Sequence, residues 1–148
     1  MDSIQISLRL TDFLGCWSFE RRVQHEAQPE ACAVGTAYWR ETGAGAEYVE
    51  SAELRIEGHP PMQAERRYLW TPELDVLFED GRYFHAVPPT GGVARHWCDP
   101  DDYRVQYDFS DWPEFETIWH VNGPRKSYVM TTRYRRGQSR LNTSALRQ

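Results

Sequence analysis

The strongest constraint on the fold is a series of short segments in which apolar and polar residues alternate, separated by turn-forming residues. In residues 103–109, for example, Tyr103, Val105, Tyr107 and Phe109 alternate with polar residues. Because successive side chains of a strand point to opposite faces, a period of two predicts strands rather than helices. Ten such segments are expected, over residues 16–26, 32–41, 47–57, 63–71, 74–78, 82–87, 93–98, 103–109, 115–121 and 126–135.

The connections between these segments are short, and several carry strong turn signals. Asp80-Gly81 lies between two apolar runs and predicts a hairpin, as does Asn122-Gly123-Pro124. Tight turns between consecutive strands favour a meander over a Greek key, and closing the meander removes exposed edges. We therefore predict an all-β fold: a single closed or nearly closed antiparallel up-and-down β-barrel of about ten strands, after one short N-terminal helical turn.

The chain of 148 residues is long enough for one domain with a proper core. We expect residues 1–136 to form the barrel domain. Residues 137–148 are rich in polar residues and Arg, which predicts a flexible tail.

Charge and cysteine content exclude several classes of function. The formal net charge of -5 argues against nucleic-acid binding, which needs a basic footprint. No apolar run approaches the roughly 18 residues of a membrane span. The three cysteines are too few, and odd in number, for a disulfide framework, so we expect a cytoplasmic protein with reduced thiols.

His96 and Cys98 share a strand face, but no set of three or four ligands accompanies them, so no metal site is predicted.

A resemblance to a known superfamily rests on Gly15-Cys16-Trp17, which follows the helical turn expected around Leu10–Leu14. This segment is similar to the Gly-x-Trp opening of the calycins, which include lipocalins, fatty-acid-binding proteins and nitrobindin-like barrels. The wider pattern comprises FLGCWSFER, RRYLW, FEDGRYFH, HWCDPDDYRVQYDF and WHVNGPRKSYVMTTRYRR. It resembles an uncharacterised bacterial calycin-like family, a domain of unknown function, over roughly residues 13–136.

The resemblance implies how the barrel closes but implies no activity. Gly15 and Trp17 would lie at the closed end, and an arginine of the last strand would pack on the Trp17 ring. Arg133 is the expected arginine, with Arg135 as its neighbour. Nothing in the chain matches the haem-ligating histidine region of nitrobindins, and no cofactor is expected.

An excess of aromatic residues suggests what the interior could hold. Phe, Trp and Tyr make up 14% of the chain, and such rings either fill a small barrel or line a ligand cavity. The leading hypothesis is an interior site for a small, largely apolar ligand with a polar or anionic end. Candidate wall residues are Trp17, Phe19, Trp39, Trp70, Phe84, Tyr107 and Trp119, and candidate polar anchors are Arg66, His85, His96, Tyr107 and Arg133.

Two alternatives remain open. The first is an enzyme that uses His85 or His96 as a general base in the same cavity, although no catalytic residue is assigned. The second is a filled barrel whose surface, or basic C-terminal end, docks a partner. A homodimer is compatible with either.

The alternation in residues 82–87 also predicts which way the candidate base points. It places His85 on the same strand face as Tyr83, with Phe84 on the other face.

Overall fold

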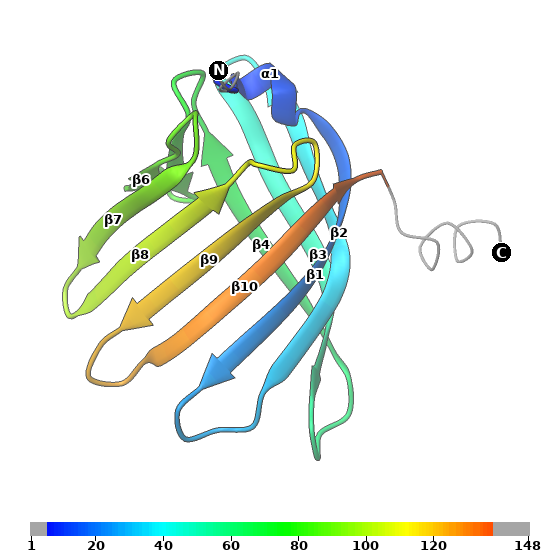
Figure 1. Cartoon of the computed structure of the whole chain (residues 1–148), viewed down its shortest axis with the longest axis vertical. Helices are drawn as coiled ribbons and strands as arrows, with labels where there is room; N and C mark the ends of the chain where they lie inside the picture. The colour runs from blue at the N-terminus through cyan, green and yellow to red at the C-terminus, as the bar shows by residue number, and fades with distance from the viewer. Residues whose placement is uncertain (1–5, 138–148) are drawn as a thin grey trace, which may run out of the picture.

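The computed structural model describes residues 6–137. Within these residues, ten antiparallel strands form one sheet that curls into a nearly closed barrel, and a short helix covers one end (Figure 1). The predicted fold class is confirmed. The elements are α1 (Leu10–Phe13), β1 (Gly15–His25), β2 (Ala31–Thr42), β3 (Gly45–Ile56), β4 (Met62–Trp70), β5 (Asp75–Phe78), β6 (Tyr83–Ala86), β7 (Gly92–Cys98), β8 (Asp101–Asp108), β9 (Phe115–Asn122) and β10 (Ser127–Arg136).

The strand order is β6-β5-β4-β3-β2-β1-β10-β9-β8-β7, so every strand pairs with its neighbours in sequence except at one place. The first and last strands pair directly, with Trp17 opposite Arg136. β6 and β7 form the two ends of the sheet, and side chains close the seam between them. The Phe84 ring lies 5.6 Å from the His96 ring and 5.5 Å from the Tyr103 ring, measured between centroids.

The strands agree with the predicted segments to within a few residues, but one face assignment is wrong. Tyr83 is exposed whereas Phe84 and His85 are both buried, at 1% exposure each. The pairing of β5 with β6 shifts register between Val76 and Leu77. Such an irregularity re-aims side chains, so simple alternation fails in this short strand. The tail predicted for residues 137–148 lies outside the described residues, apart from Gly137.

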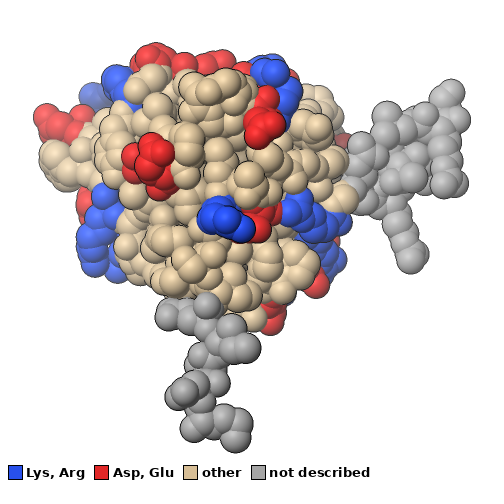
Figure 2. Space-filling model, turned by 90° about the horizontal axis from the view of Figure 1, so that it is seen from above, with Lys and Arg blue, Asp and Glu red and all other residues tan. Residues whose placement is uncertain are grey.

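Aromatic packing seals the end of the barrel that carries α1. Phe13 and Trp17 are fully buried, and their rings contact those of Trp39, Trp112 and Phe115 at centroid distances of 5.2–5.7 Å. The indole N–H of Trp17 donates a hydrogen bond to the Phe13 carbonyl at 2.8 Å, which ties the helix to the first strand. Figure 2 shows this end, where uncharged atoms cover most of the surface.

The arginine that packs on Trp17 is Arg136, which corrects the prediction of Arg133 or Arg135. The guanidinium carbon of Arg136 lies 4.2 Å from the Trp17 ring centroid. Its nitrogens also donate to the carbonyl oxygens of Leu14, at 2.7 Å, and of Asp12. Residues opposite each other in a sheet share a face, and Trp17 pairs with Arg136. Arg133 and Arg135 are an odd number of residues from Arg136 and therefore point to the other face.

Arg133 lies on the other face of β10. Its guanidinium contacts the carboxylates of Asp111 at 3.0 Å, Glu114 at 3.7 Å and Glu116 at 4.0 Å, all on the outer surface. Arg133 is therefore a member of a surface charge cluster and plays no part in barrel closure.

Candidate ligand-binding cavity

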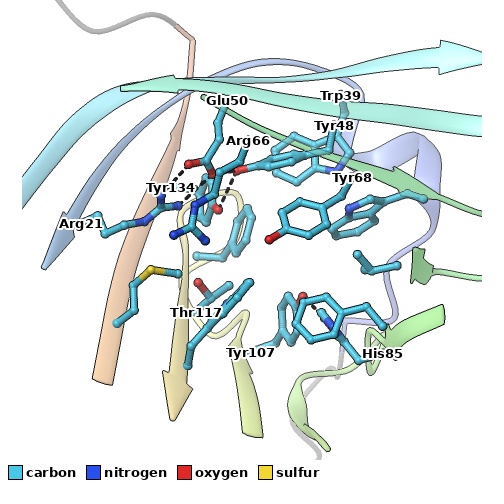
Figure 3. A pocket seen from close by; sticks show the side chains of 16 residues that line it. Arg21, Trp39, Tyr48, Glu50, Arg66, Tyr68, His85, Tyr107, Thr117 and Tyr134 are labelled. Atoms are coloured by element: carbon cyan, nitrogen blue, oxygen red, sulfur yellow. Dashed lines mark hydrogen bonds and ion pairs between the residues drawn. The ribbon is translucent and has the colours of Figure 1, made fainter. Parts of the chain in front are cut away.

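A cavity lies inside the barrel below the aromatic end. Side chains from every strand except β7 line it: Arg21, Trp39, Tyr48, Glu50, Arg66, Tyr68, Trp70, Val76, Phe84, His85, Tyr107, Phe115, Thr117, Trp119, Met130 and Tyr134 (Figure 3). The space open to the centres of water molecules is about 40 Å³. This is room for roughly three waters. The interior is therefore neither an empty channel nor completely filled.

One wall of the cavity holds a buried ion pair. Arg21 of β1 donates two hydrogen bonds to the Glu50 carboxylate of β3, at 2.5 and 2.9 Å. The strand between them, β2, presents only small residues at Ala33, Gly35 and Ala37, so the Arg21 side chain can reach across it. Glu50 is 4% exposed and Arg21 is 7% exposed, so both charges are removed from water.

Neighbouring hydroxyl groups complete this pair. The Arg21 Nε donates to Thr132 at 2.8 Å, and the Tyr48 hydroxyl donates to Glu50 at 2.5 Å. The Tyr134 hydroxyl lies 3.0 Å from that of Tyr48. Each guanidinium nitrogen of Arg21 thus has a partner, and the carboxylate accepts three hydrogen bonds. We call these five residues the Arg21–Glu50 network.

The network fixes the charge of its members. Burial raises the pKa of Glu50, but the hydrogen bonds and charge of Arg21 outweigh it, and the net pKa is below the ordinary value. Burial lowers the pKa of Arg21, and the bonds and charge of Glu50 reverse this, so the net pKa is raised. Burial raises the pKa of Tyr134 to about 12. At neutral pH the network is a fixed ion pair with neutral hydroxyls.

Arg66 of β4 lines the same cavity but has no such partner. It pairs in register with Glu50 and is half-buried, yet it forms no ion pair with any carboxylate among residues 6–137. Its guanidinium carbon lies 5.9 Å from the centroid of the Trp119 ring. Its charge opposes the rise in pKa that burial causes at Tyr68 and Tyr128. Its charge also contributes to the low pKa of the neighbouring Glu50, but that carboxylate is bonded to Arg21 and forms no ion pair with Arg66.

A second polar pair lies on another side of the cavity (Figure 3). His85 of β6 and Tyr107 of β8 are joined by a hydrogen bond of 2.7 Å between Nε2 and the hydroxyl oxygen. Burial lowers the pKa of His85 to about 3, with a further contribution from nearby His96. Burial also raises the pKa of Tyr107 well above its ordinary value. Both groups are therefore neutral at pH 7.

The structure brings together seven of the eleven candidate wall and anchor residues. Arg66, His85, Tyr107 and Trp119 line the cavity, as do Trp39, Trp70 and Phe84 from the predicted wall. The other candidates lie elsewhere: Trp17 and Phe19 belong to the core beside the cavity, and Arg133 is on the outer surface. His96 packs against the rings of Phe84 and Tyr103 and is not hydrogen-bonded to His85 within the described chain.

The Arg21–Glu50 network was not predicted as part of the wall. A signal was present, because Arg21 shares a strand face with Trp17 and Phe19, and Glu50 shares one with Tyr48. Charged residues within an apolar stripe indicate burial and hence a partner. Choosing the partner required the register of β1 against β3 across β2, which alternation alone does not supply.

Two further features concern function. Residues 6–137 contain no group of three or more His, Cys, Asp or Glu side chains arranged to hold a metal ion. No helix in that range is long and apolar enough to cross a membrane.

The fold and cavity define a ten-stranded antiparallel β-barrel with a small interior site. The chain belongs to a family of unknown function (DUF6314), whose model matches residues 13–136. Among solved structures it is similar to the S-type phycobiliprotein lyase CPES from Guillardia theta, with a TM-score of 0.56. That similarity covers 88% of this chain and 92% of the lyase at 10% sequence identity, so it shows a shared fold alone. No curated protein matches the chain.

Proposed function

We propose that this protein binds a small, largely apolar ligand with a polar or anionic end inside the barrel. The observation that carries the proposal is the half-buried Arg66, which lines an interior cavity and has no ion pair among the described residues. A charge removed from water is costly unless it is paired, so an anionic ligand group would complement it. The hydroxyl groups of Tyr68 and Tyr128 could add hydrogen bonds to the same anion.

The rest of the wall suits an apolar body. Trp70, Val76, Phe84 and Phe115 present rings and an aliphatic side chain, a composition typical of small-molecule sites. Burial of apolar ligand surface contributes about 25 cal/mol per Å². The cavity of about 40 Å³ is smaller than a ring-sized ligand needs, so binding requires side chains to move. Arg66, Tyr68 and Trp119 are only half-buried and are the side chains best able to do so.

The catalytic alternative receives less support. A general base is most effective when its pKa is near the working pH, and burial holds the pKa of His85 at about 3. Its Nε2 is already bonded to Tyr107, and no described hydrogen bond links it to His96. We therefore favour binding over acid–base catalysis. We also expect binding to occur in the cytoplasm, since Cys16, Cys32 and Cys98 are free thiols.

Native mass spectrometry of the purified protein, compared with a denatured sample, tests the proposal. We expect an additional mass in the native sample that is lost on denaturation and that belongs to a small organic acid with an apolar body. Arg66→Leu protein purified in the same way should carry less of it. A native mass equal to that of the bare chain, together with no binding of 4-fluorobenzoate in solution, would contradict the proposal.

A further inference from the structure

The His85–Tyr107 pair is enclosed in the barrel with an incomplete set of hydrogen bonds. His85 is 1% exposed and Tyr107 is 6% exposed. Their mutual bond of 2.7 Å is the one side-chain hydrogen bond that either makes within residues 6–137. The other ring nitrogen of His85, Nδ1, is buried and has no partner there.

The His85–Tyr107 pair has more donor hydrogens than its single hydrogen bond can use. Neutral imidazole carries one N–H, and the tyrosine hydroxyl carries one O–H. Burial keeps both groups neutral, because it lowers the pKa of His85 to about 3 and raises the pKa of Tyr107. Two donors share one bond, so one hydrogen is left without an acceptor in either tautomer. If Tyr107 donates to Nε2, that hydrogen is on Nδ1, and if Nε2 donates to Tyr107, it is on the tyrosine oxygen.

The unsatisfied hydrogen is at the cavity wall. A hydrogen on Nδ1 would be buried with no acceptor in reach, whereas the Tyr107 O–H can rotate toward the cavity that its side chain lines, which favours the tautomer with the N–H on Nε2. The Tyr107 O–H is then the donor that remains, and both residues line the cavity. Figure 3 shows the pair on a different side of the cavity from Arg66.

We propose that His85 and Tyr107 form a neutral anchor that donates one hydrogen bond to an uncharged carbonyl-type oxygen of the ligand. The anchor carries no charge and packs against apolar rings, with the Phe84 ring 4.3 Å and the Phe109 ring 5.8 Å away between centroids. A carboxylate there would lose its hydration without gaining a counter-ion, whereas a ketone, ester or amide oxygen loses little. This inference rests on the proposed function and names a second polar group of the ligand.

Two probes of nearly equal shape test it. 4-Fluoroacetophenone has a carbonyl oxygen, and 1-ethyl-4-fluorobenzene has two hydrogens in its place. Titrations followed by ¹⁹F NMR give the dissociation constant of each for the native protein and for Tyr107→Phe. A hydrogen bond to an otherwise unsatisfied donor predicts that the native protein binds the ketone about 5- to 10-fold more tightly. Tyr107→Phe should abolish that preference and leave the affinity for the hydrocarbon nearly unchanged.

A matched control separates this anchor from other hydroxyl groups. Thr117→Val removes a hydroxyl from the same cavity that is not bonded to His85, and the preference for the ketone should persist. If it disappears in Thr117→Val and survives in Tyr107→Phe, the anchor is wrongly assigned. Equal affinities of the native protein for both probes would also overturn the inference, because water would then satisfy the donor. The proposed function would still stand in that case, since both probes bind. If neither probe nor 4-fluorobenzoate binds, the proposed function fails and the anchor with it.

A measurement on the unmodified protein covers the case in which Tyr107→Phe does not fold. The ¹⁵N chemical shifts of the His85 ring report which nitrogen carries the hydrogen. Saturation with the ketone should shift them, and saturation with the hydrocarbon should leave them nearly unchanged. Identical shifts with the two bound probes would overturn the proposal.

Discussion

Two polar regions face the same cavity, and they differ in how completely their hydrogen bonds are satisfied. In the Arg21–Glu50 network, every guanidinium nitrogen has a partner and the carboxylate accepts three hydrogen bonds. The other polar residues are less complete: Arg66, beside Glu50 on the neighbouring strand, has no described ion pair, and across the cavity the His85–Tyr107 pair has one hydrogen without an acceptor. The network is satisfied like an ordinary part of the core, whereas Arg66 and the His85–Tyr107 pair are groups that a ligand would complete.

The contrast indicates which buried polar residues serve stability and which are available for binding. A buried ion pair adds little net stability to a fold. Removing one of its partners is nevertheless strongly destabilising, because the remaining charge is then buried alone. A polar group that is already unpaired costs free energy in the empty protein. Removing such a group should change the free energy of unfolding little and should weaken ligand binding more.

The largest effect is expected from Glu50→Gln. This change leaves the Arg21 charge buried without its counter-ion, and we expect the free energy of unfolding to fall by about 3–5 kcal/mol. Urea denaturation measures it. The combined change Arg21→Met with Glu50→Leu should recover most of the loss, because no charge is then left buried. Glu30→Gln is the matched control, since it breaks the exposed Arg22–Glu30 pair and should scarcely alter stability. A loss in the control as large as in Glu50→Gln would refute the assignment.

A smaller effect should appear as a pH dependence caused by His85. Its pKa falls from 6.5 in the unfolded chain to about 3 in the fold. Below pH 6.5 the unfolded chain binds a proton that the folded protein does not, so this contribution to stability is complete above that pH and is lost as the pH falls toward 3. Between pH 7 and pH 5 the loss amounts to about 2 kcal/mol, because stability falls by about 1.36 kcal/mol for each pH unit below 6.5.

His85→Gln isolates this contribution, because glutamine does not titrate. Urea denaturation at pH 7 and pH 5 should show a drop in stability for the native protein that is about 2 kcal/mol larger than for the variant. Glu50 titrates in a lower range, because its pKa lies below the ordinary 4.5. The same drop in both proteins would show that His85 is not buried in its neutral form.

A smaller effect again is expected from Arg136→Leu at the sealed end. The change removes the guanidinium from the Trp17 ring and two hydrogen bonds to carbonyl oxygens. A cation over an aromatic ring contributes about 0.5–2 kcal/mol, and Arg136 is on the surface, so a loss near 1 kcal/mol is expected. Thermal unfolding, followed by tryptophan fluorescence, measures it. Arg135→Leu, which removes a surface contact to Glu114, should have less effect, and the reverse order would contradict the closure described here.

Sequence alone predicted the fold well because alternation and turn signals are local properties. The barrel and the approximate bounds of the strands follow from them. The errors arose where the pairing of strands, which alternation does not reveal, decides the direction of a side chain. The register shift between β5 and β6 buries both Phe84 and His85, and the pairing of Trp17 with Arg136 depends on where the first and last strands meet.

The cavity was predicted in part for the same reason. Arg66, His85, Tyr107 and Trp119 could be named because polar and aromatic residues inside strands stand out in the sequence. Which of the arginines would find a carboxylate could not be predicted. Arg21 and Arg66 both lie among aromatic residues in predicted strands, and only the three-dimensional arrangement shows that Glu50 pairs with Arg21.

The most direct test of the comparison is a pair of measurements on Arg66→Leu: its free energy of unfolding and its affinity for 4-fluorobenzoate. We predict stability equal to that of the native protein within about 1 kcal/mol, because no described ion pair is lost. We also predict at least about 10-fold weaker binding of the benzoate, because a hydrogen-bonded charge pair with the ligand is removed. A variant destabilised by several kcal/mol that binds the benzoate as the native protein does would contradict the assignment of Arg66 to binding.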